Sequence, residues 1–312
     1  MEKKLICRVL TGPTASGKSD IAFRIARENG WEIICMDSMQ IYRGMDIGTA
    51  KPTKEEQRAV PHHMLDICDP RDPYSVSMYT EAAEHTVREI AESGRQALFV
   101  GGTGLYLEGM ARGMSMGNAP ADESLRARLR ILAETPEGRR MLEERLREAD
   151  PETADRLPQN DIRRRIRAIE VYETTGIPFS KQPGRKEGSS FRWIIISTCM
   201  EGEHLYRRIN RRVDRMLQAG LADEVEKLLE AGVPDDAQSM QAIGYKEMIP
   251  YLRGECSTEK AADEIRKRTR HYAKRQMTFL KRIDNVIYMD SESENAYEKI
   301  REIFMKDGDG RV

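Results

Sequence analysis

The chain reads Gly12-Pro13-Thr14-Ala15-Ser16-Gly17-Lys18-Ser19 directly after its first apolar run, Leu5–Leu10. A helical pattern follows the stretch, and a phosphate-binding loop requires this order of strand, glycine-rich turn and helix. Gly12 and Gly17 let the backbone curl, so that successive N–H groups point at phosphate oxygens beside the positive end of the helix dipole. We expect Lys18 to reach the outer phosphates and Ser19 to ligate Mg²⁺. The loop alone leaves open which diphosphate or triphosphate it binds.

The composition is that of a globular protein of about two domains. The 312 residues are 39% hydrophobic and 33% charged, and no apolar run approaches the ~18 residues that span a bilayer. The apolar N-terminal stretch runs directly into the phosphate loop, which argues against a signal peptide. Five cysteines, odd in number and without a Cys-x-x-Cys pair, indicate the reducing cytoplasm and argue against structural zinc. We expect a cytoplasmic monomer.

The charges are clustered although the net charge is −1. The segment Arg266–Arg282 holds eight Lys or Arg and no Asp or Glu, and Glu203–Arg215 holds five Arg. A third cluster comprises Arg163, Arg164, Arg165 and Arg167. One such run is usually a solvated helix face, but three in a near-neutral protein indicate a track for a polyanion.

Strand and helix patterns alternate over residues 1–113. Expected strands are Ile33–Met36, Met64–Cys68 and Ala97–Val100, and Ser75 is expected to cap a long helix that stops near Ser93. This alternation predicts an α/β fold: a parallel sheet flanked by helices, like that of the P-loop NTPases.

The character of the sequence changes after residue 114. Arg, Glu, Leu and Ala recur at helical spacing from Ser124 to Thr174, without a strand signal. Strand patterns return at Trp193–Ser197 and Asn285–Met289. We therefore expect a core of residues 1–114 and 188–312, with C-terminal helices, and an all-helical insertion domain of residues 115–187. Gly117–Pro120 and Gln182–Gly188 are the expected linkers, and the tail after Asp307 is expected to fray.

Several polar residues follow the predicted strands. Asp37 ends the second strand, where ligands bind in such sheets, and a carboxylate there can hold Mg²⁺, contact a nucleoside or act as a base. Gly101-Gly102-Thr103-Gly104 follows another strand at the position where nucleotide hydrolases often carry a metal-binding Asp. Helical spacing puts Arg208, Arg211 or Arg212, and Arg215 on one face, where a guanidinium could stabilise a leaving diphosphate.

Five separated segments together resemble the tRNA dimethylallyltransferase family, also called tRNA isopentenyltransferases: Gly12–Ser19, Asp37–Pro52, Gly101–Tyr106, Asn160–Glu170 and Gln241–Glu247. The most specific is Asp-Ser-x-Gln-x-Tyr-x-x-Met-Asp-Ile-Gly-Thr-Ala-Lys-Pro, starting at Asp37. The resemblance covers about residues 5–290. The resemblance is to the bacterial form of the family, so we expect no zinc-finger tail of the kind that eukaryotic relatives carry.

The resemblance implies transfer of a dimethylallyl group from dimethylallyl diphosphate to N6 of the adenosine immediately 3′ of the anticodon, in tRNAs that read codons beginning with U. The phosphate loop would then bind the prenyl diphosphate, with Mg²⁺, instead of ATP. By the family match Asp37 is the general base, Arg212 and Lys18 neutralise the leaving group, and Thr103 lies near the reacting centre.

The same match implies contacts with the tRNA anticodon stem-loop. These residues are Asp37, Ser38, Met39, Gln40, Thr103, Asp161, Ile162, Arg163, Arg164, Arg165, Gln241, Ala242, Ile243, Gly244, Tyr245, Lys246 and Glu247. The helical insertion would hold the anticodon stem, and the basic C-terminal helices would follow the RNA backbone.

Three other readings share parts of this pattern. A small-molecule or nucleoside kinase would have the same loop and sheet, but the arginine clusters and the missing Asp at the Gly101-Gly102-Thr103 strand tip argue against it. A prenyltransferase acting on free AMP or ADP would not need the large insertion. An RNA-binding module with a vestigial loop would not need an intact Lys18 and Ser19.

Overall fold

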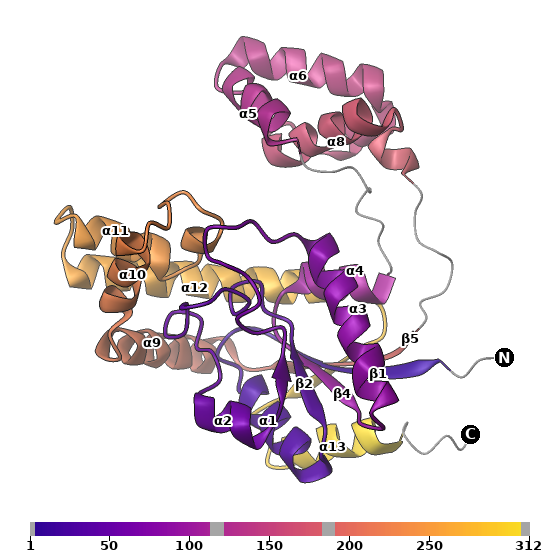
Figure 1. The fold of residues 1–312 in the computed structure, drawn as a ribbon, viewed down its shortest axis with the longest axis vertical. Coiled ribbons are helices and arrows are strands. Elements are labelled where there is room, and N and C mark those ends of the chain that lie inside the picture. The colour runs from indigo at the N-terminus through magenta and orange to yellow at the C-terminus, as the bar shows by residue number, and fades with distance from the viewer. Residues whose placement is uncertain (1–3, 113–121, 183–190, 307–312) are drawn as a thin grey trace. The chain divides into compact units, whose positions relative to one another are not determined.

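The computed structural model describes residues 4–112, 122–182 and 191–306 (Figure 1). The chain divides into two compact units, one formed by Met1–Ala111 with Ser189–Val312 and the other by Arg112–Gly188. The expected linker Gly117–Pro120, nearly all of the Gln182–Gly188 linker and the tail after Asp307 lie outside the described residues.

A six-stranded parallel sheet is the centre of the first unit, with the strand order β3-β2-β4-β1-β5-β6. The strands are β1 (Leu5–Thr11), β2 (Glu32–Cys35), β3 (His62–His63), β4 (Ala97–Val100), β5 (Phe191–Cys199) and β6 (Val286–Asp290). Leu10 of β1 pairs with Val100 on one side and with Ile196 on the other, so the carboxyl ends of these three strands lie together. This arrangement confirms the predicted P-loop-like α/β fold.

Helices flank the sheet of this unit, and a further group of helices packs together beside it (Figure 1). They are α1 (Lys18–Asn29), α2 (Lys54–Ala59), α3 (Val76–Glu92), α4 (Gly104–Arg112), α9 (Gly202–Gln218), α10 (Leu221–Glu230), α11 (Tyr245–Leu252), α12 (Thr258–Leu280) and α13 (Ala296–Lys306), with a 3₁₀ turn at Ser239–Gln241. Ser75 caps α3 by accepting from the Met78 N–H, and Ser93 ends the helix, as predicted. Leu10 and Ile25 pack with Phe304, so α1 and α13 share one core with the sheet.

The third strand is not where the sequence placed it. The edge strand is His62–His63, which pairs with Ile33 and Ile34 of β2, and the Met64–Cys68 prediction is wrong. Met64 and Asp66 have φ values of 61° and 55°, a left-handed conformation that ends strand pairing. The His63 ring hydrogen-bonds to the buried Glu32 carboxylate at 2.6 Å.

The second unit is a bundle of helices α5 (Glu123–Leu132), α6 (Pro136–Ala149), α7 (Pro151–Arg156) and α8 (Ile162–Thr175), with a 3₁₀ turn at Phe179–Lys181. Leu129, Leu146 and Ile169 lie in its core. Each helix begins at a side-chain cap, for example Thr135 and Asp161. No strand occurs among the described residues of this unit, in agreement with the helical pattern of Ser124–Thr174.

Candidate active site

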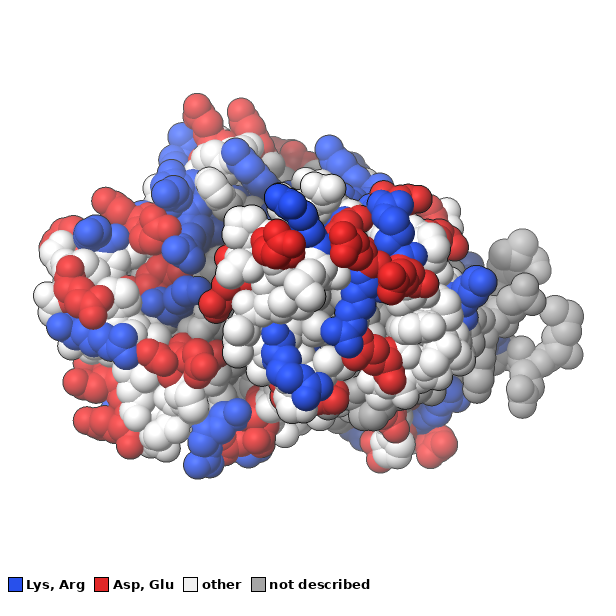
Figure 2. Space-filling model, turned by 90° about the horizontal axis from the view of Figure 1, so that it is seen from above, with Lys and Arg blue, Asp and Glu red and all other residues white. Residues whose placement is uncertain are grey.

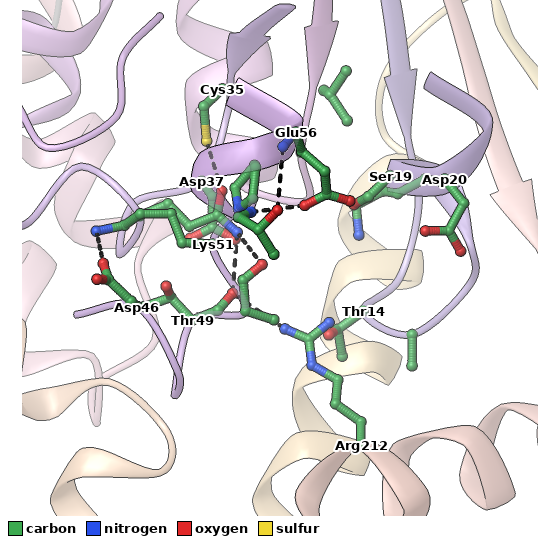
Figure 3. A pocket seen from close by; sticks show the side chains of 18 of the residues that line it. Thr14, Ser19, Asp20, Cys35, Asp37, Asp46, Thr49, Lys51, Glu56 and Arg212 are labelled. Atoms are coloured by element: carbon green, nitrogen blue, oxygen red, sulfur yellow. Dashed lines mark hydrogen bonds and ion pairs between the residues drawn. The ribbon is translucent and has the colours of Figure 1, made fainter. Parts of the chain in front are cut away.

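A cavity of about 1150 Å³ opens at the carboxyl ends of the strands in the first unit (Figure 3). It is lined by the phosphate loop and the start of α1, by Asp37, by the segment Asp46–Lys54 and by the arginines of α9. Figure 3 shows Thr14 and Ser19 on one side and Asp37 across the cavity from them, with Arg212 reaching in from α9. Residues more than 170 positions apart in sequence therefore form one site.

Tertiary contacts hold the phosphate loop in its curled form. Gly12 and Gly17 have φ values of 138° and 86°. A Cβ on Gly12 would lie 2.3 Å from the Thr198 hydroxyl, so only glycine fits there. The Thr198 and Ser16 hydroxyls share a buried hydrogen bond of 2.6 Å, and Thr198 also donates to the Thr11 carbonyl. Thr198, at the end of β5, gave no recognisable sequence signal.

Gln276 ties the phosphate loop to the tip of β4. Its side-chain oxygen accepts from the Thr14 N–H at 2.8 Å, and its amide nitrogen donates to the Gly102 carbonyl at 2.9 Å. Sequence reasoning missed this residue, whose only distinction is to be a neutral amide within the basic run Arg266–Arg282. Gln276 is buried and thus sets the distance between the phosphate loop and Thr103.

Two cations reach the floor of the cavity. Lys18 Nζ donates to the Pro13 carbonyl at 3.3 Å, and Arg212 Nη2 donates to the Thr49 carbonyl at 3.2 Å. Burial, and then the nearby Arg212 charge, lower the pKa of Lys18 to about 8. Burial also lowers the pKa of Arg212. Arg208, which also lines the cavity, donates to the Ala15 carbonyl of the phosphate loop at 2.8 Å, whereas Arg212 bonds to Thr49.

Asp37 and Thr103 follow the neighbouring strands β2 and β4. One Asp37 oxygen accepts from the Met39 N–H at 2.9 Å, while the Thr103 hydroxyl accepts from the Ser38 N–H at 3.0 Å. Burial, and then the Asp37 charge, raise the pKa of Tyr272, which keeps this cavity-lining phenol neutral. Asp37 thus presents a carboxylate to the cavity beside two hydroxyl groups.

Gln40 and Lys51 organise the loop that follows Asp37. The Gln40 amide accepts from the Cys35 thiol and donates to the carbonyls of Thr49 and Ala50. Lys51, whose side chain is 2% exposed, donates to the carboxylates of Asp46 and Asp66. Gln40 is predicted as a tRNA contact, but in this structure its side-chain amide hydrogen-bonds within the protein, to the loop that follows Asp37.

The predicted tRNA segment Gln241–Glu247 divides into buried and exposed residues. Ala242, Tyr245 and Glu247 are buried, and Glu247 caps α11 by accepting from the Gly244 N–H. Gln241 and Lys246 are exposed and hydrogen-bond to each other at 2.8 Å. Ile243 is half-buried. The side chains that this segment offers to a ligand are therefore Gln241 and Lys246.

The segment Asp161–Arg165 lies at the start of α8 in the helical unit. Asp161 caps the helix, Ile162 packs against the core, and Arg163 and Arg164 are exposed. Arg165 differs from the prediction: it is 3% exposed, and its guanidinium bonds to Glu143 and to the carbonyls of Pro158 and Leu157. Because these internal partners occupy it, we correct Arg165 from an RNA contact to a structural residue.

Basic and acidic side chains intermingle over the face shown in Figure 2. In the first half of α12, Arg266 pairs with Asp214 and Asp263, and Arg268 pairs with Glu264 and Glu247. In the second half, the exposed Lys274 and Arg275 lie over tyrosine rings, each at 5.8 Å from the ring centre. The charge count alone did not distinguish these two halves.

The tip of β4 excludes an acidic side chain. A Cβ on Gly101 would lie 2.0 Å from the Met36 carbonyl, and one on Gly102 would lie 2.0 Å from the Gln276 amide. A metal-binding Asp, as nucleotide hydrolases often place at such a tip, cannot fit without displacing backbone. This packing argues against an ordinary ATPase or kinase site.

The described residues, 4–112, 122–182 and 191–306, contain neither a metal-ligand cluster nor a membrane-spanning helix. Over this part of the chain no three His, Cys, Asp or Glu residues are grouped as metal ligands. No helix there is long and apolar enough to cross a membrane. The five cysteines are free, and burial raises the pKa of Cys7 to about 12.

The chain matches known proteins over nearly its whole length. A family model described as IPP transferase matches residues 40–283, and one described as isopentenyl transferase matches residues 5–68. A tRNA dimethylallyltransferase of Pelotomaculum thermopropionicum is 44% identical over 292 residues, which are 93% of this chain and 92% of the relative.

Two solved structures have the same fold. The full-length tRNA isopentenylpyrophosphate transferase of Bacillus halodurans superposes with a TM-score of 0.72 at 39% identity, covering 97% of this chain and 96% of the other. A eukaryotic dimethylallyltransferase acting on tRNA superposes with a TM-score of 0.78 at 27% identity, covering 98% of this chain and 79% of the other. By sequence and fold alike, this chain belongs to the IPP transferase family.

Proposed function

We propose that the chain transfers a dimethylallyl group from dimethylallyl diphosphate to N6 of the adenosine immediately 3′ of the anticodon, in tRNAs that read codons beginning with U. The observation that carries the proposal is the shared cavity of a phosphate loop, a carboxylate at Asp37 and an arginine at Arg212. The names of the relatives support dimethylallyl transfer to tRNA. The tRNA substrate and the free cysteines favour the reducing cytoplasm as the compartment.

The chemistry follows from the positions of these groups. The N6 nitrogen attacks C1 of the donor, the C1–O bond breaks, and its electron pair leaves on the diphosphate. The Asp37 carboxylate takes the proton from N6, a task for which positioned bases contribute about 10²–10⁴-fold. The amides of the phosphate loop, Lys18 and Arg212 stabilise the negative charge that develops on the leaving group. Tyr272 lines the cavity with a neutral hydroxyl, and the Thr103 hydroxyl accepts from the Ser38 N–H, next to Asp37.

The donor set of the cavity fits Mg²⁺. The Ser19 hydroxyl at the start of α1 is a hard oxygen ligand, and Mg²⁺ commonly completes its shell with substrate phosphates and waters. We propose that Ser19 holds the ion against the diphosphate. When bound, the ion supplies additional charge neutralisation for the leaving group.

The RNA contacts that we propose for the first unit are Lys274 and Arg275 on α12, with Gln241 and Lys246 before and on α11. The helical unit, taken by itself, offers Arg163 and Arg164. These side chains are exposed and suit a phosphate backbone or an unstacked base. The target adenosine has to leave the anticodon-loop stack to enter the cavity. We expect one copy of the chain to act alone.

The deciding experiment uses labelled dimethylallyl diphosphate, Mg²⁺ and unmodified tRNA carrying the target adenosine. Parallel reactions contain AMP, ADP or ATP in place of tRNA. We expect label in RNA only, and nuclease digestion should locate it at the nucleotide 3′ of the anticodon. Label in AMP or ADP would instead identify a free-nucleotide prenyltransferase. ATP consumption without labelled RNA would identify a kinase.

The lowered pKa of Lys18 predicts weaker diphosphate binding at high pH. The ammonium binds the anion, and in the free protein it is lost as the pH rises through about 8, whereas the bound anion keeps it protonated. We therefore expect the affinity for inorganic pyrophosphate with Mg²⁺ to fall about tenfold between pH 7 and pH 9, with proton uptake on binding at pH 9. Calorimetric titration in buffers of different ionisation enthalpy measures both quantities.

Lys18→Met is the control for this pH dependence. With this variant, any remaining change of affinity with pH comes from the ionisation of pyrophosphate and not from Lys18. The variant should bind more weakly at every pH and lack the part of the fall that Lys18 causes. Parallel profiles for the two proteins would contradict the assignment.

Replacing Lys274 and Arg275 together by Ala should weaken tRNA binding and its dependence on salt. Each lost phosphate contact removes nearly one unit of slope, so the plot of log association constant against log salt should become shallower by about 1–2. Filter binding between 50 and 300 mM salt measures the slope. Lys299→Ala with Arg301→Ala, an exposed basic pair on α13, is the matched control. An unchanged slope in the α12 variant would remove this pair from the interface.

A further inference from the structure

Glu224 on α10 is bound to the backbone of the cavity loop. Its two carboxylate oxygens accept from the N–H groups of Asp46, Ile47 and Gly48 at 2.9, 2.8 and 3.1 Å. The Tyr245 hydroxyl donates to the same carboxylate at 2.5 Å. Four donors thus converge on one side chain that sequence analysis did not single out. Charge-assisted bonds of this kind are about twice as strong as neutral ones.

Packing reinforces these bonds on the same side of the loop. Tyr245 is 0% exposed, and its phenol ring lies directly against the loop at Gly48. A Cβ on Gly48 would approach the ring to 2.4 Å, so no larger residue allows this contact. The loop is consequently fixed both by hydrogen bonds to Glu224 and by direct apposition to the phenol ring.

The other side of the loop faces the cavity. The Thr49 carbonyl, one residue beyond Gly48, accepts from Gln40 at 3.0 Å and from the Arg212 guanidinium at 3.2 Å. The direction of this carbonyl therefore determines where the guanidinium points. Glu224 and Arg212 are not in contact, but a short rigid piece of backbone joins them.

We propose that Glu224 is a positioning residue that, by holding the Asp46–Gly48 amides, aims the Thr49 carbonyl and through it the Arg212 guanidinium at the leaving diphosphate. This inference rests on the proposed function. A carboxylate is required because the three N–H groups need two acceptor oxygens. A glutamine provides one oxygen and would direct its NH₂ group at an N–H donor. Replacing Glu224 should therefore disturb the position of the Arg212 guanidinium. It should not disturb the residues that contact RNA.

The test is a double-mutant cycle of Glu224→Gln and Arg212→Ala in the full chain. If Glu224 acts through Arg212, Glu224→Gln should lower kcat about tenfold or more in the wild-type background. In the Arg212→Ala background it should change kcat by less than about twofold. KM for tRNA should stay unchanged in both. Glu226→Gln, an exposed neighbour on α10, is the matched control and should behave as wild type.

Tyr245→Phe is a second, milder variant that tests the same proposal if Glu224→Gln does not fold. It keeps the ring against Gly48 and removes one bond to Glu224, so it should lower kcat about threefold, again only when Arg212 is present. Thermal unfolding of each variant identifies loss of structure. Equal fold-losses of kcat in both Arg212 backgrounds, or a lower Tm with unchanged kcat, would overturn the proposal.

Pyrophosphate binding separates failure of this inference from failure of the proposed function. Titration of Mg²⁺ and inorganic pyrophosphate requires no tRNA and no prenyl transfer. Glu224→Gln should weaken this binding several-fold with Arg212 present and leave it unchanged in Arg212→Ala. If the wild-type protein does not label tRNA, the proposed function fails, and this cycle still decides whether Glu224 positions Arg212.

Discussion

Asp37→Asn should reduce the turnover of tRNA by at least about a hundredfold while leaving tRNA binding nearly intact. The asparagine retains an oxygen to accept from the Met39 N–H, so the loop geometry is preserved. What it loses is the ability to take the proton from N6. Single-turnover transfer of labelled donor, together with filter binding of tRNA, measures the two effects separately.

Asp236→Asn is the control for this substitution, because it makes the same chemical change at an exposed position away from the cavity. It should retain wild-type turnover. If Asp37→Asn also turned over tRNA within about threefold of wild type, Asp37 would not be the base, since a positioned base contributes far more than that.

Arg212→Ala should lower kcat by about 10²–10³-fold, the usual cost of removing one preorganised donor from a developing anion. The guanidinium enters the cavity and is held by the Thr49 carbonyl, so its charge is directed before the donor binds. Arg212→Lys should recover little of this rate, because an ammonium lacks the planar set of donors. Rapid-quench measurement of the chemical step shows the loss directly.

Arg207→Ala is the matched control on the same helix. Arg207 is exposed and pairs with Glu203 at 3.9 Å, so its removal should change kcat by less than about twofold. An Arg212→Ala variant with normal kcat but weak tRNA binding would make Arg212 an RNA contact and contradict its role at the leaving group.

Local patterns predicted much of the fold. The strand before Gly12, the strand Ala97–Val100 and the cap at Ser75 each depend on a few neighbouring residues, and the structure has all three. The prediction of a strand at Met64–Cys68 was wrong because the backbone is left-handed at Met64 and Asp66, and the pairing occurs at His62–His63 instead. Neither Met nor Asp is a residue type that indicates this conformation.

The residues of the candidate site also fall into those that local patterns predicted and those that they did not. Lys18, Ser19 and Asp37 were predicted from the sequence, because a phosphate loop and a strand end are recognised from adjacent residues. Arg212 and Thr103 came from the resemblance to a family. Thr198, Gln276 and Glu224 carry no local signal, since each acts on backbone that lies far away in sequence.

Patterns of neighbouring residues were enough to predict a parallel sheet around a phosphate loop and the similarity to prenyl-transferring enzymes. Which charged side chains a ligand can reach depends instead on tertiary contacts. Arg165 is buried and paired with Glu143, whereas Lys274 and Arg275 are exposed at the surface. The physical reason is that burial and hydrogen bonding depend on which distant groups the fold brings within about 3 Å, and no spacing along the chain encodes that proximity.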